Sequence, residues 1–266
     1  MPEDPDLPLA FLTAGQAEAY LDGACVAILR TREEMEHWLR EPAPGVEWLQ
    51  VEGLIGDPEV WAVAAQGDID IPLDVVLDDP ATEFSSLYRL VDVRLARSVR
   101  LTMPAKPGLM KGLRMAASLN LAVRILPGQP DPATLEELGL AAEFYLHDSM
   151  VESPIEFFHS LLALFRGKAE GTLWSFLEQD PATYSHRDPD GKPLRPVDFV
   201  ESHLAALIES AAECESCRWQ SACAGYFKSP DPSYDCAGVK QLLATIEEAA
   251  NEIGSEIASQ EVAPSA

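Results

Sequence analysis

The sequence predicts an α/β fold in which a partial (β/α) barrel-like parallel sheet is followed by a helical, cysteine-rich C-terminal region. Three observations predict it. Short apolar runs alternate with segments of helical period up to about residue 150, the later pattern is mainly helical, and four cysteines gather near the C-terminus. We expect an acidic leader over 1–20, the barrel-like domain over 21–150, a helical linker with the cysteine-rich domain over 151–253, and a frayed tail over 254–266.

The strands of the sheet are expected in five short apolar runs and one shorter segment. They are Cys25–Arg30, Glu47–Ile55, Ile71–Leu77, Ser98–Met103, Ala122–Leu126 and, as the short sixth, Tyr145–His147. Parallel strands need crossover connections, and the alternation with helices supplies them. Five or six units are too few for an eight-fold barrel. A partial barrel or an open α/β sheet fits, and periodicity does not separate the two.

Helices are expected where apolar residues recur with a period near 3.6. The first has the clearest start, because Thr31 can act as its N-cap and Glu34 follows at the capping-box spacing. The expected helices of the first domain are 33–41, Pro58–Gln66, Glu83–Ala96, Gly108–Asn120 and Pro132–Phe144. Those of the later part are Pro154–Gly167, Leu173–Glu178, Val197–Glu213 and Val239–Ile253, with a polar loop over Thr183–Pro196.

Composition limits the partners of this chain. It has 266 residues and a formal net charge of −25, which repels nucleic acid and anionic membrane surfaces. No apolar run approaches the ~20 residues that a membrane span needs. The N-terminus is acidic and lacks a basic segment, so we expect no secretory signal and a cytoplasmic location, where thiols stay reduced.

One band of basic residues breaks the acidic pattern. Between residues 86 and 130, Asp92 is the single acid among eight Arg and Lys residues. These are Arg89, Arg94, Arg97, Arg100, Lys106, Lys111, Arg114 and Arg124. Such a band either docks an acidic peptide or partner protein or is a solvated helix face, and we favour the solvated face.

Four of the five cysteines lie within 23 residues, in the pattern C-x2-C-x5-C-x12-C. They are Cys214, Cys217, Cys223 and Cys236. Four thiolates suit either one [4Fe–4S] cluster or one tetrahedral zinc ion. Either centre would have four protein ligands and no open coordination position, which indicates electron transfer or structural support. Cys25 lies inside an apolar strand and is expected to be a buried core thiol.

Three features favour the iron–sulfur cluster over zinc. Trp219, Tyr226 and Phe227 interleave with the cysteines and would exclude water. Two prolines, at positions 230 and 232, stiffen the connector to the last cysteine. Cys236 precedes the last helix, whose backbone N–H groups and positive dipole end would face an anionic cluster. Structural zinc more often uses two C-x2-C knuckles, and one is present here.

The run CESCRWQSACAGYFKSPDPSYDC resembles part of a SPASM domain, the auxiliary-cluster domain of radical SAM peptide-maturing enzymes. The family pattern is C-x2-C-x5-C-x3-C followed by a downstream cysteine. Cys214, Cys217 and Cys223 match its first three positions, and Cys236 matches the downstream one. Phe227 stands at the x3 position, and the upstream cysteine pair for the family's second auxiliary cluster is absent. The resemblance therefore implies one auxiliary-type [4Fe–4S] cluster.

The preceding region is also similar to this family. SVRLTMPAKPGLMKGLRMAASLNLAVRIL resembles a strand–helix–strand of the radical SAM partial barrel. PIEFFHSLLALFRG and LWSFLEQDP resemble the segment that links the barrel to the SPASM domain. The C-terminal region is therefore expected to be SPASM-like.

The chain departs from the family where the catalytic cluster would bind. Radical SAM enzymes hold that cluster with C-x3-C-x2-C after the first strand, whereas TREEMEHW follows the expected first strand here. Cys25 is the one cysteine upstream of Cys214, although three thiolates are needed. The glycine-rich segment of the family is at best echoed by Gly56-Asp57-Pro58-Glu59. The resemblance thus implies no SAM cofactor and no SAM cleavage by this chain alone.

We therefore expect an iron–sulfur-binding accessory or electron-relay protein that is not a stand-alone enzyme and has no catalytic residues of its own. Its expected partners are a radical SAM protein, a peptide substrate or both, during peptide or protein modification. The alternative is a zinc-stabilised binding module for a peptide or protein. An enzyme acting through a strand-end pocket ranks last, because no G-x-S-x-G, P-loop or G-x-G-x-x-G motif occurs.

Overall fold

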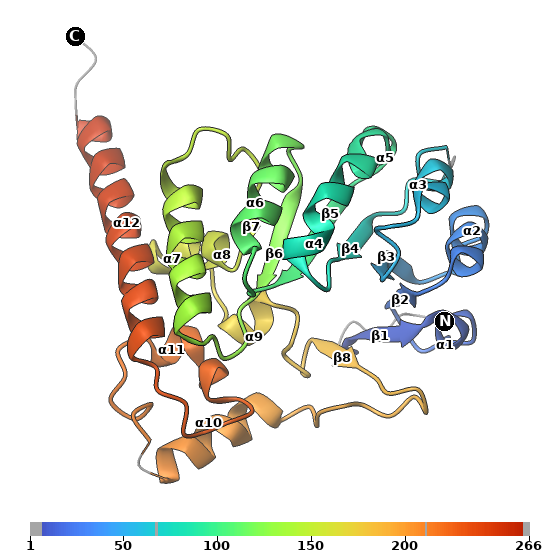
Figure 1. Cartoon of the computed structure of the whole chain (residues 1–266). Coiled ribbons are helices and arrows are strands. Elements are labelled where there is room, and N and C mark those ends of the chain that lie inside the picture. The colour runs from blue at the N-terminus through green and yellow to red at the C-terminus, as the bar shows by residue number, and fades with distance from the viewer. Residues whose placement is uncertain (1–6, 67–68, 211, 263–266) are drawn as a thin grey trace.

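The computed structural model describes residues 7–66, 69–210 and 212–262. One parallel sheet of eight strands curls into a half-barrel, in the order β7-β6-β5-β4-β3-β2-β1-β8 (Figure 1). β7 and β8 form the two edges of the described sheet, so the barrel is partial, as the sequence predicts. The strands are β1 Leu9–Thr13, β2 Cys25–Leu29, β3 Val46–Glu52, β4 Leu73–Val76, β5 Val99–Pro104, β6 Ala122–Leu126, β7 Ile155–Glu156 and β8 Tyr184–His186.

Most of the larger helices lie along one side of the curled sheet, and the long C-terminal helix packs against α7 and α8 (Figure 1). The helices of the first half are α1 Ala14–Glu18, α2 Arg32–Arg40, α3 Pro58–Ala64, α4 Pro80–Glu83, η1 Phe84–Arg89, α5 Leu90–Ala96 and α6 Leu109–Ser118. Those of the second half are α7 Pro132–His147, α8 Phe158–Phe165, α9 Leu173–Phe176, α10 Phe199–Glu209, α11 Gln220–Cys223, η2 Tyr226–Lys228 and α12 Ala237–Val262. None of the described helices is both long and apolar enough to cross a membrane.

The core forms between the sheet and its covering helices, because successive side chains of a strand point to opposite faces. In β4, Leu73 and Val75 are buried in the apolar core, whereas Asp74 between them binds Arg100 and Arg124 on the other face, the inner face of the half-barrel. Cys25 is 1% exposed within β2, so the prediction of a buried core thiol is confirmed. The expected cap of α2 is also present, with Glu34 N donating to Thr31 Oγ1 at 3.2 Å.

The N-terminal segment differs from the loose acidic leader expected over 1–20. Residues 1–6 lie outside the described residues, but Leu9–Thr13 forms β1 between β2 and β8, and Ala14–Glu18 forms α1. Phe11 in β1 is 1% exposed. Proline and acidic residues flank the run LAFLT closely, so its five residues carry little local signal, and its two partner strands define it.

The later part of the chain corrects three further expectations. Tyr145–His147, the expected sixth strand, is the last turn of α7, because the helical pattern from Pro132 continues through it. β7 and β8 lie beyond the expected boundary at residue 150, and β8 lies within the expected polar loop. The helix α12 continues to Val262, so the described part of the expected frayed tail is helical, and 263–266 lie outside the described residues.

The basic band over 89–124 is neither a continuous docking face nor a single solvated face. Arg97 is 4% exposed and donates through Nε to the Ala64 carbonyl at 2.9 Å. Arg100 and Arg124 turn to the inner face of the sheet, where they bind acidic side chains. The exposed members of the band are Arg94, Lys106, Lys111 and Arg114.

Candidate functional site

The four clustered cysteines line one small cavity of about 30 Å³. Cys214 and Cys217 come from the segment after α10, Cys223 ends α11, and Cys236 immediately precedes α12. The structure therefore brings together all four residues that the sequence singles out, across 22 positions of chain. The other residues that line this cysteine cavity are Glu213, Gln220, Gly225, Phe227, Lys228, Val239, Lys240 and Leu243.

Two consecutive left-handed residues shape the cavity. Cys223 N donates to the Trp219 carbonyl at 2.9 Å and ends α11. Ala224 and Gly225 follow with φ of 46° and 74°, which reverses the chain into η2. A Cβ atom on Gly225 would lie 2.7 Å from Cδ1 of Leu207, so both the conformation and the close approach of α10 favour glycine here. The reversal places Cys223 and Phe227 on the same cavity wall.

Three charged residues form a clamp at the cavity. Glu213 Oε1 lies 2.8 Å from Lys228 Nζ, and its Oε2 accepts a hydrogen bond from Lys240. Cys236 N also donates to Glu213 Oε1, at 3.2 Å. Hydrogen bonds from Lys228 and Lys240 lower the pKa of Glu213 to about 2, so this carboxylate is ionised. The clamp keeps one net positive charge beside the thiols.

Burial favours the protonated form of the thiols. It raises the pKa of Cys223 to about 11, although the backbone N–H groups of Phe227 and Tyr226 lower the pKa by hydrogen bonding. Burial also raises the pKa of Cys236 to about 12, against the attraction of Lys228. Unliganded, these groups are neutral thiols near pH 7, and a bound metal would have to displace their protons.

The cysteine region is fastened to the loop that follows β6. Gln129 Nε2 donates to the Phe227 carbonyl at 3.0 Å and to the Asp231 carbonyl at 2.8 Å. The Tyr234 hydroxyl donates to the Pro130 carbonyl at 2.6 Å. The cavity is thus held against the carboxyl-terminal edge of the sheet, where ligand sites of parallel α/β folds usually lie.

The arrangement of donors differs from a site for a single ion. Among residues 7–66, 69–210 and 212–262, no group of three or more His, Cys, Asp or Glu side chains is arranged to hold one metal ion. The four cysteines instead line the wall of a shared space.

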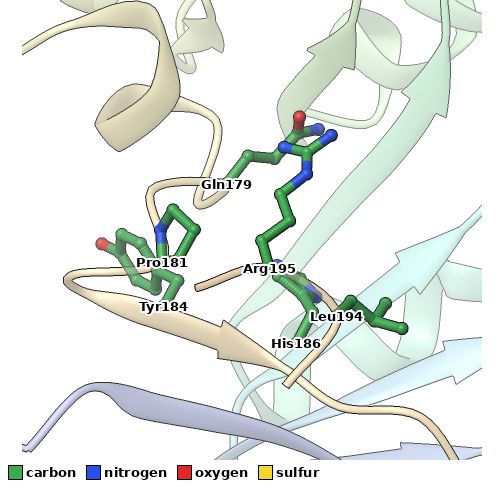
Figure 2. Close-up of a pocket in the computed structure, with 6 residues that line it drawn as sticks. All are labelled: Gln179, Pro181, Tyr184, His186, Leu194 and Arg195. Atoms are coloured by element: carbon green, nitrogen blue, oxygen red, sulfur yellow. The ribbon is translucent and has the colours of Figure 1, made fainter. Parts of the chain in front are cut away.

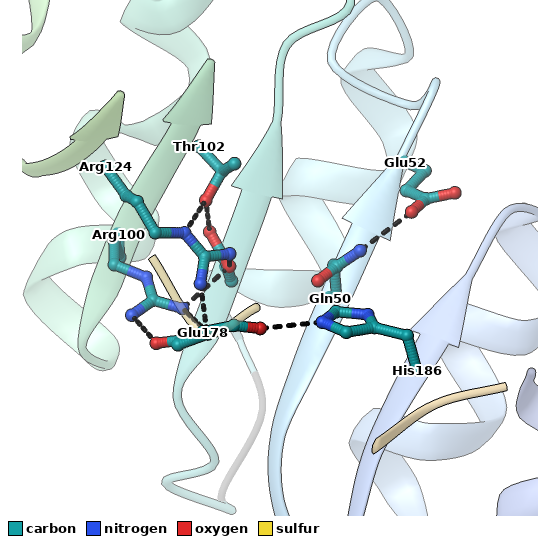
Figure 3. A network of polar contacts seen from close by, with 8 residues as sticks. Gln50, Glu52, Arg100, Thr102, Arg124, Glu178 and His186 are labelled. Atoms are coloured by element: carbon teal, nitrogen blue, oxygen red, sulfur yellow. Dashed lines mark hydrogen bonds and ion pairs between the residues drawn. The ribbon is translucent and has the colours of Figure 1, made fainter. Parts of the chain in front are cut away.

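A second polar cluster lies on the inner face of the sheet (Figure 3). Asp74 Oδ2 accepts from Arg100 at 2.8 Å and from Arg124 at 2.7 Å, and its Oδ1 accepts from Thr102 at 2.7 Å. Glu178, just after α9, binds both arginines, with its Oε1 2.6 Å from Arg100 Nη1. Asp74 and Arg100 are direct partners in the β4–β5 register. Two cations and two anions thus neutralise one another in a buried network.

The sequence analysis does not identify this inner-face network, although part of its signal is present. A charged residue interrupts each of three neighbouring apolar runs, as Asp74, Arg100 and Arg124. Because neighbouring parallel strands place such residues side by side, the pattern indicates a polar cluster. Glu178 has no comparable local signal, because it lies 54 positions beyond Arg124 and follows a short helix.

Comparison with known proteins identifies the fold. No protein-family model and no curated protein matches the chain. The solved structure of native anSMEcpe with bound AdoMet and Cp18Cys peptide is similar, with a TM-score of 0.55 and 11% sequence identity. The match covers 94% of this chain and 100% of that chain. At this identity the likeness shows the fold alone, a partial (β/α) barrel that this chain shares with that structure.

Proposed function

We propose that Cys214, Cys217, Cys223 and Cys236 bind one [4Fe–4S] cluster, and that the chain is an accessory or electron-relay protein in peptide or protein modification. The single observation that carries the proposal is the cavity that all four cysteines line. The shared fold with anSMEcpe, a protein solved with AdoMet and a peptide, supports the link to that chemistry. The cysteine spacing that resembles a SPASM domain supports it independently.

The apolar lining of the cavity and the single C-x2-C pair favour a cluster over zinc. A tetrahedral zinc ion needs four sulfur atoms about 2.3 Å from one point. A cubane cluster is larger, and its four terminal thiolates lie around it at separate corners. The cavity volume of about 30 Å³ is close to that of one water molecule, so the four side chains must move apart to hold a cubane. The apolar side chains of Phe227, Val239 and Leu243 complete the wall and would exclude water.

The remaining cavity residues suit an anionic occupant. When bound, a cluster of this kind supplies one-electron transfer. Lys228 and Lys240 hold positive charge against the thiolates, and Glu213 fixes the position of both ammonium groups. The backbone N–H groups of Tyr226 and Phe227 face the Cys223 sulfur and stabilise its thiolate form.

We further propose that this chain does not cleave SAM. In the family that the sequence resembles, three cysteines after the first strand hold the catalytic cluster. Here the first strand β1 ends at Thr13, which is also the N-cap of α1, so no loop separates strand and helix. Cys25, the one upstream cysteine, is 1% exposed in β2. The electron-relay role therefore requires a separate radical SAM protein as partner.

Anaerobic purification followed by iron and acid-labile sulfide analysis tests the cluster. We expect about four of each per chain, with broad visible absorption. Cys223→Ser is expected to lose most of both. Cys25→Ala is the matched control, because it removes a buried thiol outside the cavity and should keep the iron. One zinc ion per chain without sulfide would instead support the zinc-stabilised binding module.

An anaerobic pull-down with purified radical SAM proteins tests the accessory role. The expected result is a complex that forms with the cluster-loaded chain and weakens with the Cys223→Ser variant. Incubation of the reduced, loaded chain alone with SAM should yield no cleavage products. Absence of a complex with any radical SAM protein, or SAM cleavage by the chain alone, would contradict this role.

A further inference from the structure

A second cavity, of about 300 Å³, opens beside β8 on the inner side of the half-barrel (Figure 2). Its lining residues are Gln179, Pro181, Tyr184, His186, Leu194 and Arg195. The chain after β8 turns back over the strand, where Arg187 bridges to Pro193 and Leu194 N donates to the His186 carbonyl at 2.8 Å. This return brings Leu194 and Arg195 to the same cavity as the residues of β8. None of the clustered cysteines lines it.

Arg195 is the unusual member of this second cavity. Within the described parts of the chain, its guanidinium makes no hydrogen bond or ion pair, and it lies over the rings of Trp174 at 5.0 Å and Phe199 at 4.6 Å. Burial lowers the pKa of Arg195, which reflects partial removal from water. Arg100 and Arg124, also on the inner face, each bind two carboxylates. Arg195 therefore keeps a planar set of N–H donors available at the cavity.

We propose that the Arg195 cavity binds one carboxylate of a peptide, a ligand class that rests on the proposed role in peptide modification. A guanidinium matches a carboxylate through two parallel hydrogen bonds. The Gln179 amide, which lines the same cavity, can orient the rest of the ligand. Leu194 and Val197, which lie close to Arg195 in sequence, are 65% and 64% exposed. They offer apolar surface to a neighbouring side chain of the peptide.

Charge limits the ligand to a single carboxylate. Among the described residues that line this cavity, Arg195 is the one Arg or Lys. The whole chain carries a net charge of −25, which opposes polyanions such as nucleotides at long range. The carboxylate can come either from the C-terminus of the peptide or from an Asp or Glu side chain, and the two sources present the same chemistry to Arg195.

Calorimetric titration of the full chain with three short peptides tests the site. The probes are Ac-Leu-Ala-Leu with a free C-terminal carboxylate, the same peptide as its C-terminal amide, and Ac-Leu-Asp-Leu-amide. We expect one or both carboxylate peptides to bind at least about tenfold more tightly than the neutral amide. The comparison of the two carboxylate peptides identifies the source. Equal affinity for all three peptides, or no measurable binding of any, would overturn the proposal.

Variants then assign the preference to Arg195. Arg195→Gln should abolish the difference between the acid and amide peptides, and Arg195→Lys should retain only part of it because the bidentate fork is lost. Lys192→Gln removes an exposed cation from the same segment and should leave the preference unchanged. The affinities of the unmodified chain for the acid and amide peptides test the site even if a variant folds poorly. Iron content is a separate readout, so an unmodified chain that holds iron but shows no carboxylate preference contradicts this inference alone.

Discussion

The inner-face network and the cysteine cavity use polar side chains in opposite ways. On the sheet, Asp74 and Glu178 neutralise Arg100 and Arg124, and the charges are satisfied within the chain. In the cavity, the lysines have a carboxylate partner, but the four thiols face a shared space. A buried polar group with internal partners is explained by the fold. The four thiols line a cavity instead, and the proposed cluster would supply what they bind.

The largest expected effect comes from breaking the inner-face network. Arg124 is 4% exposed and contacts both Asp74 and Glu178. Arg124→Met removes one cation and leaves those carboxylates partly uncompensated, so we expect a loss of about 3–5 kcal/mol in the free energy of unfolding. Urea denaturation of the chain measures it. Arg114→Met, on the exposed face of α6, should change stability by less than about 0.5 kcal/mol. Equal losses in both variants would show that the network is not a special source of stability.

A smaller effect is expected from changing the shape of the cysteine cavity. Gly225→Ala places a Cβ atom on a residue with φ of 74° and 2.7 Å from Leu207. We expect a loss of about 1–3 kcal/mol in unfolding free energy, together with reduced iron content. The matched control is Gly139→Ala in α7, where a Cβ atom meets nothing within 4 Å, and it should stabilise the chain by about 0.5–1 kcal/mol. Full iron loading of a stable Gly225→Ala chain would contradict the importance of this turn.

The smallest effect concerns pH and His186, which lies beside the inner-face network. Its Nε2 donates to the Glu178 carbonyl at 2.7 Å, and its ring stacks on Phe11. Burial lowers the pKa of His186, with Arg124 and Arg195 acting in the same direction and Glu178 opposing them. The unfolded chain therefore binds the extra proton more readily, and stability is lost as pH falls below about 6.5.

The test compares urea midpoints at about pH 7.5 and about pH 5.5, on either side of the ordinary histidine pKa. The unmodified chain should lose more stability over this interval than His186→Gln, which carries no titrating ring. An identical pH response in both chains would show that His186 is not desolvated enough to matter. A larger loss of stability in His186→Gln than in the unmodified chain would indicate that glutamine disrupts the inner-face network itself.

Local pattern predicts part of this molecule, and distant partners determine the rest. The cap formed by Thr31 and Glu34 depends on a few neighbouring residues and could be identified from sequence. β1 and β8 are five and three residues long; they are strands because β1 pairs with β2 and β8 pairs with β1. Such pairing joins segments more than 170 positions apart, which periodicity does not detect.

The candidate site also contains residues that the sequence predicts and residues that only the structure reveals. Spacing alone singles out Cys214, Cys217, Cys223 and Cys236, because cysteines so close together in a reduced protein indicate metal binding. The clamp of Glu213 with Lys228 and Lys240 was not predictable, because charged residues are common throughout the chain. Arg195 is likewise distinguished only by its missing carboxylate partner among the described residues, which requires three-dimensional structure.

Native mass spectrometry of the anaerobically purified chain tests the central claim most directly, because it weighs whatever the cysteine cavity holds. The predicted result is one mass increment equal to four iron and four sulfide ions, retained in Cys25→Ala and lost in Cys223→Ser. A chain that carries a single zinc ion, or that keeps the four-iron increment after Cys223 and Cys236 are both replaced by serine, would contradict the account.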